Sequence, residues 1–96
     1  MNLTIQSIHF DADQKLLDFI QKKVEKLASY NNRIVNGEVY LKLDKSGDNE
    51  NKVTEIKLHV PGHTLFSKER SRTFEQGTDA AVESLRRQIM KTKQTR

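Results

Sequence analysis

The sequence has no cysteine, and glycine and proline are scarce, with 4 Gly and 1 Pro in 96 residues. The missing cysteines exclude disulfides and thiolate metal sites. The scattered glycines form no phosphate-binding loop. No apolar run approaches the roughly 18 residues of a membrane span, and the first residues, MNLTIQSIHFDAD, lack the basic and apolar regions of a signal peptide. We therefore expect a cytoplasmic protein that does not act at a membrane.

Apolar residues are also few, because 34% of the chain is hydrophobic and 31% is charged. A chain of this length and composition supports one thin core, so residues 1–96 are expected to form a single domain. The formal net charge is +4. An excess of this sign favours an anionic partner, and nucleic acid is the first candidate.

Alternating apolar and polar residues predict four strands, at residues 2–9, 35–43, 54–60 and 64–70. In the second strand Val39, Leu41 and Leu43 share one face. The charged run KSGDNENK at residues 45–52 is expected to connect the second strand to the third, and Pro61-Gly62 to turn the chain into the fourth.

Spacings of three and four residues predict two amphipathic helices, one ending near residue 30 and one at residues 74 to about 93. Asp11 and Asp13 are both candidate N-caps of the first, and Asp11 forms a capping-box pattern with Gln14. In the second, an apolar stripe follows a capping-box pattern at Thr73 and Gln76; the stripe comprises Thr78, Ala81, Val82, Leu85 and Ile89. Gly77 is expected to weaken this helix by up to about 1 kcal/mol relative to alanine.

The order of elements predicts an α+β fold, β-α-β-β-β-α. Since a helix joins the first two strands, we expect that pair to be parallel with a right-handed crossover, followed by an antiparallel meander. Two amphipathic helices then cover one face of a four-stranded mixed sheet.

No group of residues predicts catalysis. His59 and His63 are four residues apart, but the intervening Pro61-Gly62 excludes a helical metal pair. Asp11 and Asp13 are better explained as N-cap candidates, and neither Ser67 nor Ser71 has an evident base. We therefore predict a protein that is not an enzyme and needs no metal, cofactor or small-molecule substrate.

Basic residues on the outer faces of both helices remain as a functional signal. They comprise Lys15, Lys22, Lys23, Lys26, Arg86, Arg87, Lys91 and Lys93. Solvated lysines and favourable interaction with the helix macrodipole would also explain them. However, residues 86–96 hold five basic residues and no acid, and two helices contribute to one expected surface. No stacking aromatics lie among these cations, so readout of phosphates and shape is the expected mode.

The chain resembles the short ribosome hibernation-promoting factors, also called ribosome-associated inhibitor or sigma-54 modulation proteins. The resemblance is carried, in order, by LDFIQKKVEKLASYNNRI, YLKLDK, EIKLHVPG and TFEQGTDAAVESLRRQIMKTKQ. It covers nearly the whole chain. Glu75 and Gly77 depart from the aromatic and small residues expected early in the last helix, so a looser start of that helix is expected.

The resemblance implies a fold similar to double-stranded RNA-binding domains. It also implies binding to the small ribosomal subunit, where messenger RNA and transfer RNA anticodon stems sit, so that idle ribosomes are silenced under stress or in stationary phase. The protein would be a monomer when free. The implied contacts with ribosomal RNA are Lys23, Lys26, Arg87, Lys91 and Lys93, to which placement adds Lys22 and Arg86. The alternatives are a general double-stranded RNA-binding module and a basic adaptor for an acidic protein.

Overall fold

The computed structural model describes residues 1–45 and 49–94, with side chains as far as residue 91. The elements follow in the order β1 (Asn2–Ser7), α1 (Gln14–Glu25), the 3-10 turn η1 (Lys26–Ser29), β2 (Asn36–Leu43), β3 (Lys52–Val60), β4 (His63–Ser71) and α2 (Phe74–Gln94). The predicted β-α-β-β-β-α order is therefore confirmed.

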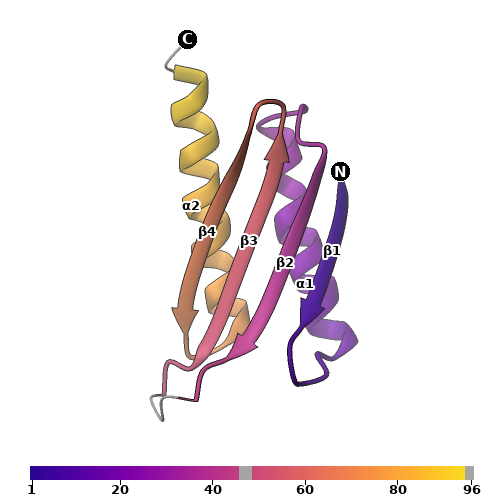
Figure 1. The fold of residues 1–96 in the computed structure, drawn as a ribbon, viewed down its shortest axis with the longest axis vertical. Helices are drawn as coiled ribbons and strands as arrows, with labels where there is room; N and C mark the ends of the chain where they lie inside the picture. Colours follow the sequence, from indigo (N-terminus) through magenta and orange to yellow (C-terminus); the bar gives the residue numbers. More distant parts are fainter. Residues whose placement is uncertain (46–48, 95–96) are drawn as a thin grey trace.

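The sheet has the strand order β1-β2-β3-β4, with β1 parallel to β2 and the other neighbours antiparallel. In register, Ile5 lies beside Val39 and Val39 beside Ile56, so apolar residues form continuous rows across the strands. Both helices lie on the same side of the sheet, α1 behind β1 and β2 and α2 behind β3 and β4 (Figure 1). The prediction of a four-stranded mixed sheet with both helices on one face is therefore confirmed.

The core is one layer between this sheet face and the two helices. Its buried apolar side chains are Ile20, Val24, Leu27, Ile34, Val39, Leu41, Ile56, Leu58, Leu65, Phe74, Ala81, Leu85 and Ile89. The rings of Phe10 and Phe74 stack 5.2 Å apart. Since Phe10 follows β1 and Phe74 begins α2, this stack joins the segment after the first strand to the start of the last helix.

The helix ends show which capping prediction was right. Asp13, not Asp11, caps α1, and its carboxylate accepts a hydrogen bond of 2.9 Å from the backbone N–H of Leu16. The α-helix ends at Glu25 and continues as η1, in which the Ser29 hydroxyl donates to the carbonyl of Lys26. The helical segment therefore ends near residue 30, as predicted, but its last turn is tighter. At α2, the hydroxyl of Thr73 accepts from the N–H of Gln76, as its capping pattern predicts.

Strand boundaries differ from the prediction by one or two residues. β1 stops at Ser7, and β3 begins at Lys52, which lies opposite Leu43 and Ser71 in the sheet. The predicted connection at residues 45–52 is consequently shorter, and its residues 46–48 lie outside the described part of the chain. Lys52 was assigned to the connection because polarity alone does not reveal strand pairing.

Gly77 is not the weak point that the sequence suggested. It is buried where α2 crosses β3, and a Cβ at this position would lie 2.6 Å from Oγ1 and 3.3 Å from Cβ of Thr54. Thr54 is fully buried and, being β-branched, has little freedom to turn away. Glycine therefore allows the close approach of helix and sheet, and helix propensity alone misjudged its effect.

We predict that Gly77→Ala lowers the free energy of unfolding by about 1–2 kcal/mol, because overpacking outweighs the propensity gain of about 1 kcal/mol. Thermal and urea melts measure this. Thr54→Ala removes the obstructing oxygen, so the double variant should lose less stability than the two single variants summed. A higher melting temperature for Gly77→Ala would contradict the proposed contact.

We also predict that Leu85→Ala costs about 2–5 kcal/mol of stability, because Leu85 is fully buried at the centre of the α2 stripe. Arg87→Ala, on the exposed face of the same helix, should stay within about 0.5 kcal/mol of the parent. Urea denaturation of both variants gives the comparison. A larger loss of stability for Arg87→Ala than for Leu85→Ala would contradict the packing of the Leu85 face of α2 against the sheet.

Candidate nucleic-acid interface

Helix α1 and the turn η1 contribute Lys22, Lys23 and Lys26. Lys22 and Lys26, four residues apart, lie on the side away from the buried Ile20 and Val24, whereas Lys23, three residues after Ile20, lies at the edge of the buried face. Lys22 and Lys26 are exposed, and neither makes an ion pair with any described residue. Lys23 is half-buried. Its Nζ lies 5.5 Å from the centroid of the Phe19 ring and 3.3 Å from Oδ1 of Asp79 on α2.

Helix α2 contributes Arg86, Arg87 and Lys91. Arg86 holds Glu83, one turn earlier, through two hydrogen bonds: Nε to Oε2 at 3.1 Å and the terminal nitrogen to Oε1 at 2.6 Å. This bond to Arg86 holds the pKa of the Glu83 carboxyl below its ordinary value. Arg87 and Lys91 are exposed and, within residues 1–45 and 49–91, have no ion-pair partner. The Lys93 side chain lies outside the described residues.

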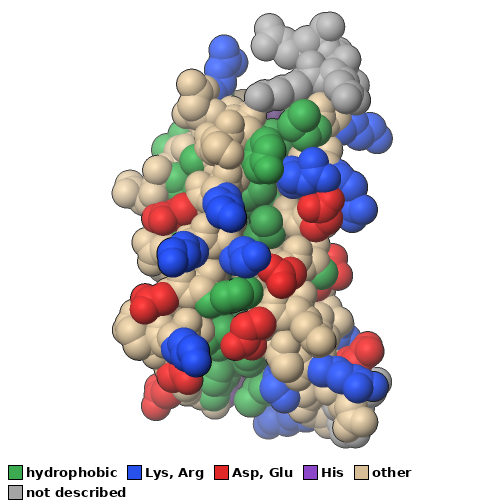
Figure 2. All heavy atoms as spheres, turned by 180° about the vertical axis from the view of Figure 1, so that it is seen from behind, with side chains coloured by type: hydrophobic (Ala, Val, Ile, Leu, Met, Phe, Trp, Pro, Cys, Tyr) green, Lys and Arg blue, Asp and Glu red, His purple; other side chains and the backbone are tan. Residues whose placement is uncertain are grey.

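A groove of about 400 Å³ runs between the two helices. From α1 and η1 it is lined by Lys23, Lys26, Leu27 and the following Tyr30, and from α2 by Asp79, Val82, Glu83 and Arg86. Figure 2 shows this face, with basic and acidic side chains on both sides of an apolar seam. Of the cations named from the sequence, Lys23, Lys26 and Arg86 line this groove. Lys22, Arg87 and Lys91 occupy exposed positions of the same two helices.

The charge of this face differs from the expected one. The sequence suggested a continuous basic surface, but Asp79 and Glu83 lie in the groove and bond to Lys23 and Arg86. The Glu83–Arg86 spacing of three residues was a readable signal for an ion pair within the helix. No local pattern indicated the Lys23–Asp79 contact, because it joins different elements. Four of the helix cations are exposed and have no ion pair within the described residues. We name them as two ridges: the α1 ridge, Lys22 and Lys26, and the α2 ridge, Arg87 and Lys91.

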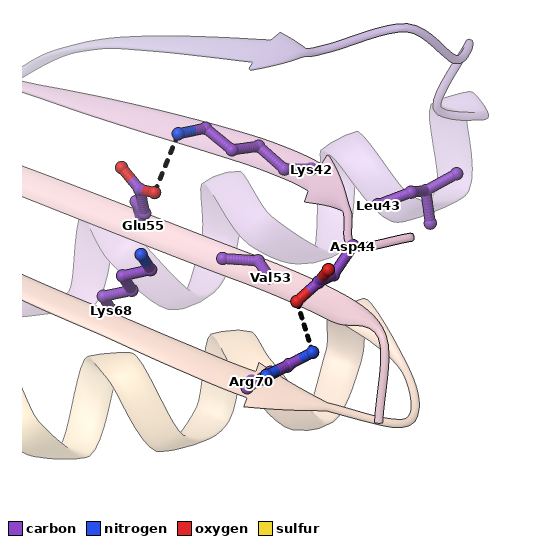
Figure 3. Close-up of a pocket in the computed structure, with 7 residues that line it drawn as sticks. All are labelled: Lys42, Leu43, Asp44, Val53, Glu55, Lys68 and Arg70. Atoms are coloured by element: carbon purple, nitrogen blue, oxygen red, sulfur yellow. Dashed lines mark hydrogen bonds and ion pairs between the residues drawn. The ribbon is translucent and has the colours of Figure 1, made fainter. Parts of the chain in front are cut away.

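The open face of the sheet is the other charged surface. A pocket of about 440 Å³ lies there over Val53, near the ends of β2, β3 and β4 (Figure 3). Lys42 bonds to Glu55 at 2.9 Å, and Arg70 forms an ion pair with Asp44. Since two of the three cations lining this pocket are neutralised by carboxylates, it offers little to a polyanion.

The histidines do not form a metal centre with acidic residues. Nε2 of His59 lies 2.9 Å from Oε2 of Glu38 across β2 and β3. Hydrogen bonds from the Tyr40 hydroxyl and from His59 hold the pKa of the Glu38 carboxyl below its usual value. Among the described residues, no three His, Cys, Asp or Glu side chains group as metal ligands would. Nor is either described helix both long and apolar enough to cross a membrane.

The model of the sigma 54 modulation protein / S30EA ribosomal protein family matches residues 3–96. The chain belongs to this family. A ribosome hibernation promoting factor of Pseudomonas putida is 28% identical over 94 residues, which span 98% of this chain and 88% of that protein. The resemblance noted in the sequence is confirmed.

Two solved structures have a similar fold. A ribosomal subunit interface protein from Coxiella burnetii superposes with a TM-score of 0.85 at 18% identity, covering 97% of this chain and 98% of that one. The N-terminal domain of Thermus thermophilus Protein Y gives 0.79 at 23% identity, covering 96% and 99%. At these identities the likeness supports the fold alone, and the fold is the predicted one.

Proposed function

We propose that this protein is a ribosome hibernation factor that binds ribosomal RNA of the small subunit in the decoding region and thereby silences idle ribosomes. Family membership and the P. putida relative support a role at the ribosome. The observation that carries the RNA contact is the placement of α1 and α2 cations on one face, on either side of a groove. The protein would act as a monomer in the cytoplasm, by occupancy and not by catalysis.

The ridge cations are the primary phosphate contacts in this proposal. Lys22, Lys26, Arg87 and Lys91 are exposed and have no ion pair with the part of the chain that the structure describes, so a phosphate oxygen replaces water around them and no described carboxylate. Lys23 and Arg86 would have to exchange a carboxylate for a phosphate. Lys93 stays in the proposed set through the family resemblance only.

The arrangement of the two ridges, with a groove between them, suits structured RNA. Double-stranded RNA is recognised largely by shape, through phosphates and sugar hydroxyls that face its shallow minor groove. Two cationic ridges separated by a groove present positive charge along two lines, as two phosphate strands require. Phosphate contacts set position and orientation without reading sequence. Selectivity for one ribosomal location would then come from RNA shape.

The decisive experiment is sedimentation of purified ribosomal subunits through a sucrose gradient with and without the protein. Selective co-migration with the small subunit supports the proposal. Equal binding to any duplex RNA favours the general RNA-binding alternative. Binding to subunits that survives RNase digestion would point to a protein partner instead.

We predict a steep dependence of subunit affinity on salt. Each neutralised phosphate contributes a slope of about −0.7 to −0.9 in log affinity against log salt concentration, so four ridge contacts give about −3. Fluorescence-anisotropy titrations at several salt concentrations measure the slope. A nearly flat dependence would contradict electrostatic binding.

We predict that neutralising either ridge weakens subunit binding while the protein stays folded. A lost phosphate contact removes on the order of 1 kcal/mol, so Lys22→Gln with Lys26→Gln, or Arg87→Gln with Lys91→Gln, should bind about thirtyfold more weakly. The matched control is Lys57→Gln with Lys68→Gln, which removes the same charge from the open sheet face. Equal losses in all three double variants would show binding through bulk charge, with no site.

A further inference from the structure

The acids of the groove lie between the two cationic ridges. Asp79 and Glu83 are one turn apart on α2, and Val82 lies between them on the groove wall. Both acids are exposed, yet each bonds to a groove cation, Asp79 to Lys23 and Glu83 to Arg86. The positive charge of the groove is therefore largely cancelled, whereas the ridges keep theirs.

A phosphate and a hydroxyl would meet this groove differently. Carboxylates are acceptors only, and a phosphodiester offers acceptors only, so a phosphate there gains no hydrogen bond from Asp79 or Glu83 and must compete with them for Lys23 and Arg86. A ribose 2′-hydroxyl is a donor and carries no charge. It can donate to either carboxylate, while its sugar packs on Val82, a half-buried apolar side chain of the groove wall. The 2′-hydroxyl is also the group that distinguishes RNA from DNA.

We infer that the inter-helix groove rejects phosphate and accepts ribose 2′-hydroxyls, so that Asp79 and Glu83 determine specificity for RNA over DNA and other polyanions. This inference rests on the proposed RNA binding by the two ridges and assigns a second role to the same face. The ridges provide affinity for any suitably spaced phosphates. The acids between them favour a duplex whose minor groove supplies sugar hydroxyl donors.

The lowered pKa of Glu83 agrees with this role, since its bond to Arg86 keeps the carboxylate ionised. The pairing also fixes where the carboxylates lie. Lys23 on α1 is oriented by the Phe19 ring as well as by Asp79, so Asp79 has a positioned partner across the groove. Neither acid contributes to the buried core, and each can be changed without removing apolar contacts.

The test compares Asp79→Asn and Glu83→Gln with Glu25→Gln. Each variant removes one negative charge and keeps the side-chain length. Glu25 is exposed and bonded to Gln21, and it lies roughly 200° around α1 from Lys23, away from the groove. The probes are an RNA duplex, a DNA duplex of the same sequence, and purified small subunits, all at one salt concentration. Thermal melts check that the variants are folded.

We predict that Asp79→Asn and Glu83→Gln each raise affinity for the DNA duplex by about two- to fivefold, as expected for removing one exposed repulsive charge. Affinity for the RNA duplex and for subunits should stay level or fall, so the RNA-to-DNA ratio decreases. Glu25→Gln should leave that ratio unchanged.

Three results would overturn the inference. The first is a parent protein that binds the RNA and DNA duplexes with equal affinity. The second is an equal gain in affinity of the groove variants for both duplexes, and the third is an equal loss of affinity for both by variants that are folded. The last result would make the acids mere positioning partners of Lys23 and Arg86. Failure of the proposed function is separate, because it would appear as a parent protein that does not bind subunits, whatever its RNA-to-DNA ratio.

Discussion

One apolar layer, between the inner sheet face and two helices, is the constraint on which the structure depends. With only 34% hydrophobic residues, the chain fills one such layer and leaves the outer helix faces and the open sheet face to water. The layer closes because α2 can approach β3 at Gly77, where a Cβ would meet Thr54 at 2.6 Å. This approach brings the outer faces of α1 and α2 onto one surface, so core packing determines where the functional cations lie.

The ion pairs on that surface contribute little to the fold. Lys23 and Asp79 are 39% and 56% exposed, and pairs so accessible to water are typically worth less than about 1 kcal/mol. Their small contribution makes them exchangeable, since a binding partner can replace one member at low cost. The buried apolar layer therefore accounts for stability, and the exposed charges can be arranged for recognition without weakening it.

Much of the fold was predictable from the sequence because hydrophobic periodicity is local. The alternation around Val39 and the helical spacing around Leu85 identified their elements and faces correctly. Contacts between elements were not predictable: Gly77 was misjudged because its neighbour Thr54 lies on β3, and Lys23–Asp79 joins two helices. For the candidate site, helical spacing therefore predicted that the basic residues lie on outer helix faces, but the contribution of Asp79 and Glu83 to the groove was overlooked.

The comparison of the two faces shows why net charge alone could not identify the site. The open sheet face carries Lys42, Lys57, Lys68 and Arg70, as many cations as the two ridges. Lys42 and Arg70 are bound to carboxylates there, and Lys23 and Arg86 are bound to carboxylates in the groove. Each face thus has two paired cations. Within the described residues, however, the helical face keeps four cations without an ion pair, against two, Lys57 and Lys68, on the open sheet. A polyanion responds to that difference, because a cation held by a carboxylate must first give up a partner, and this favours the helical face.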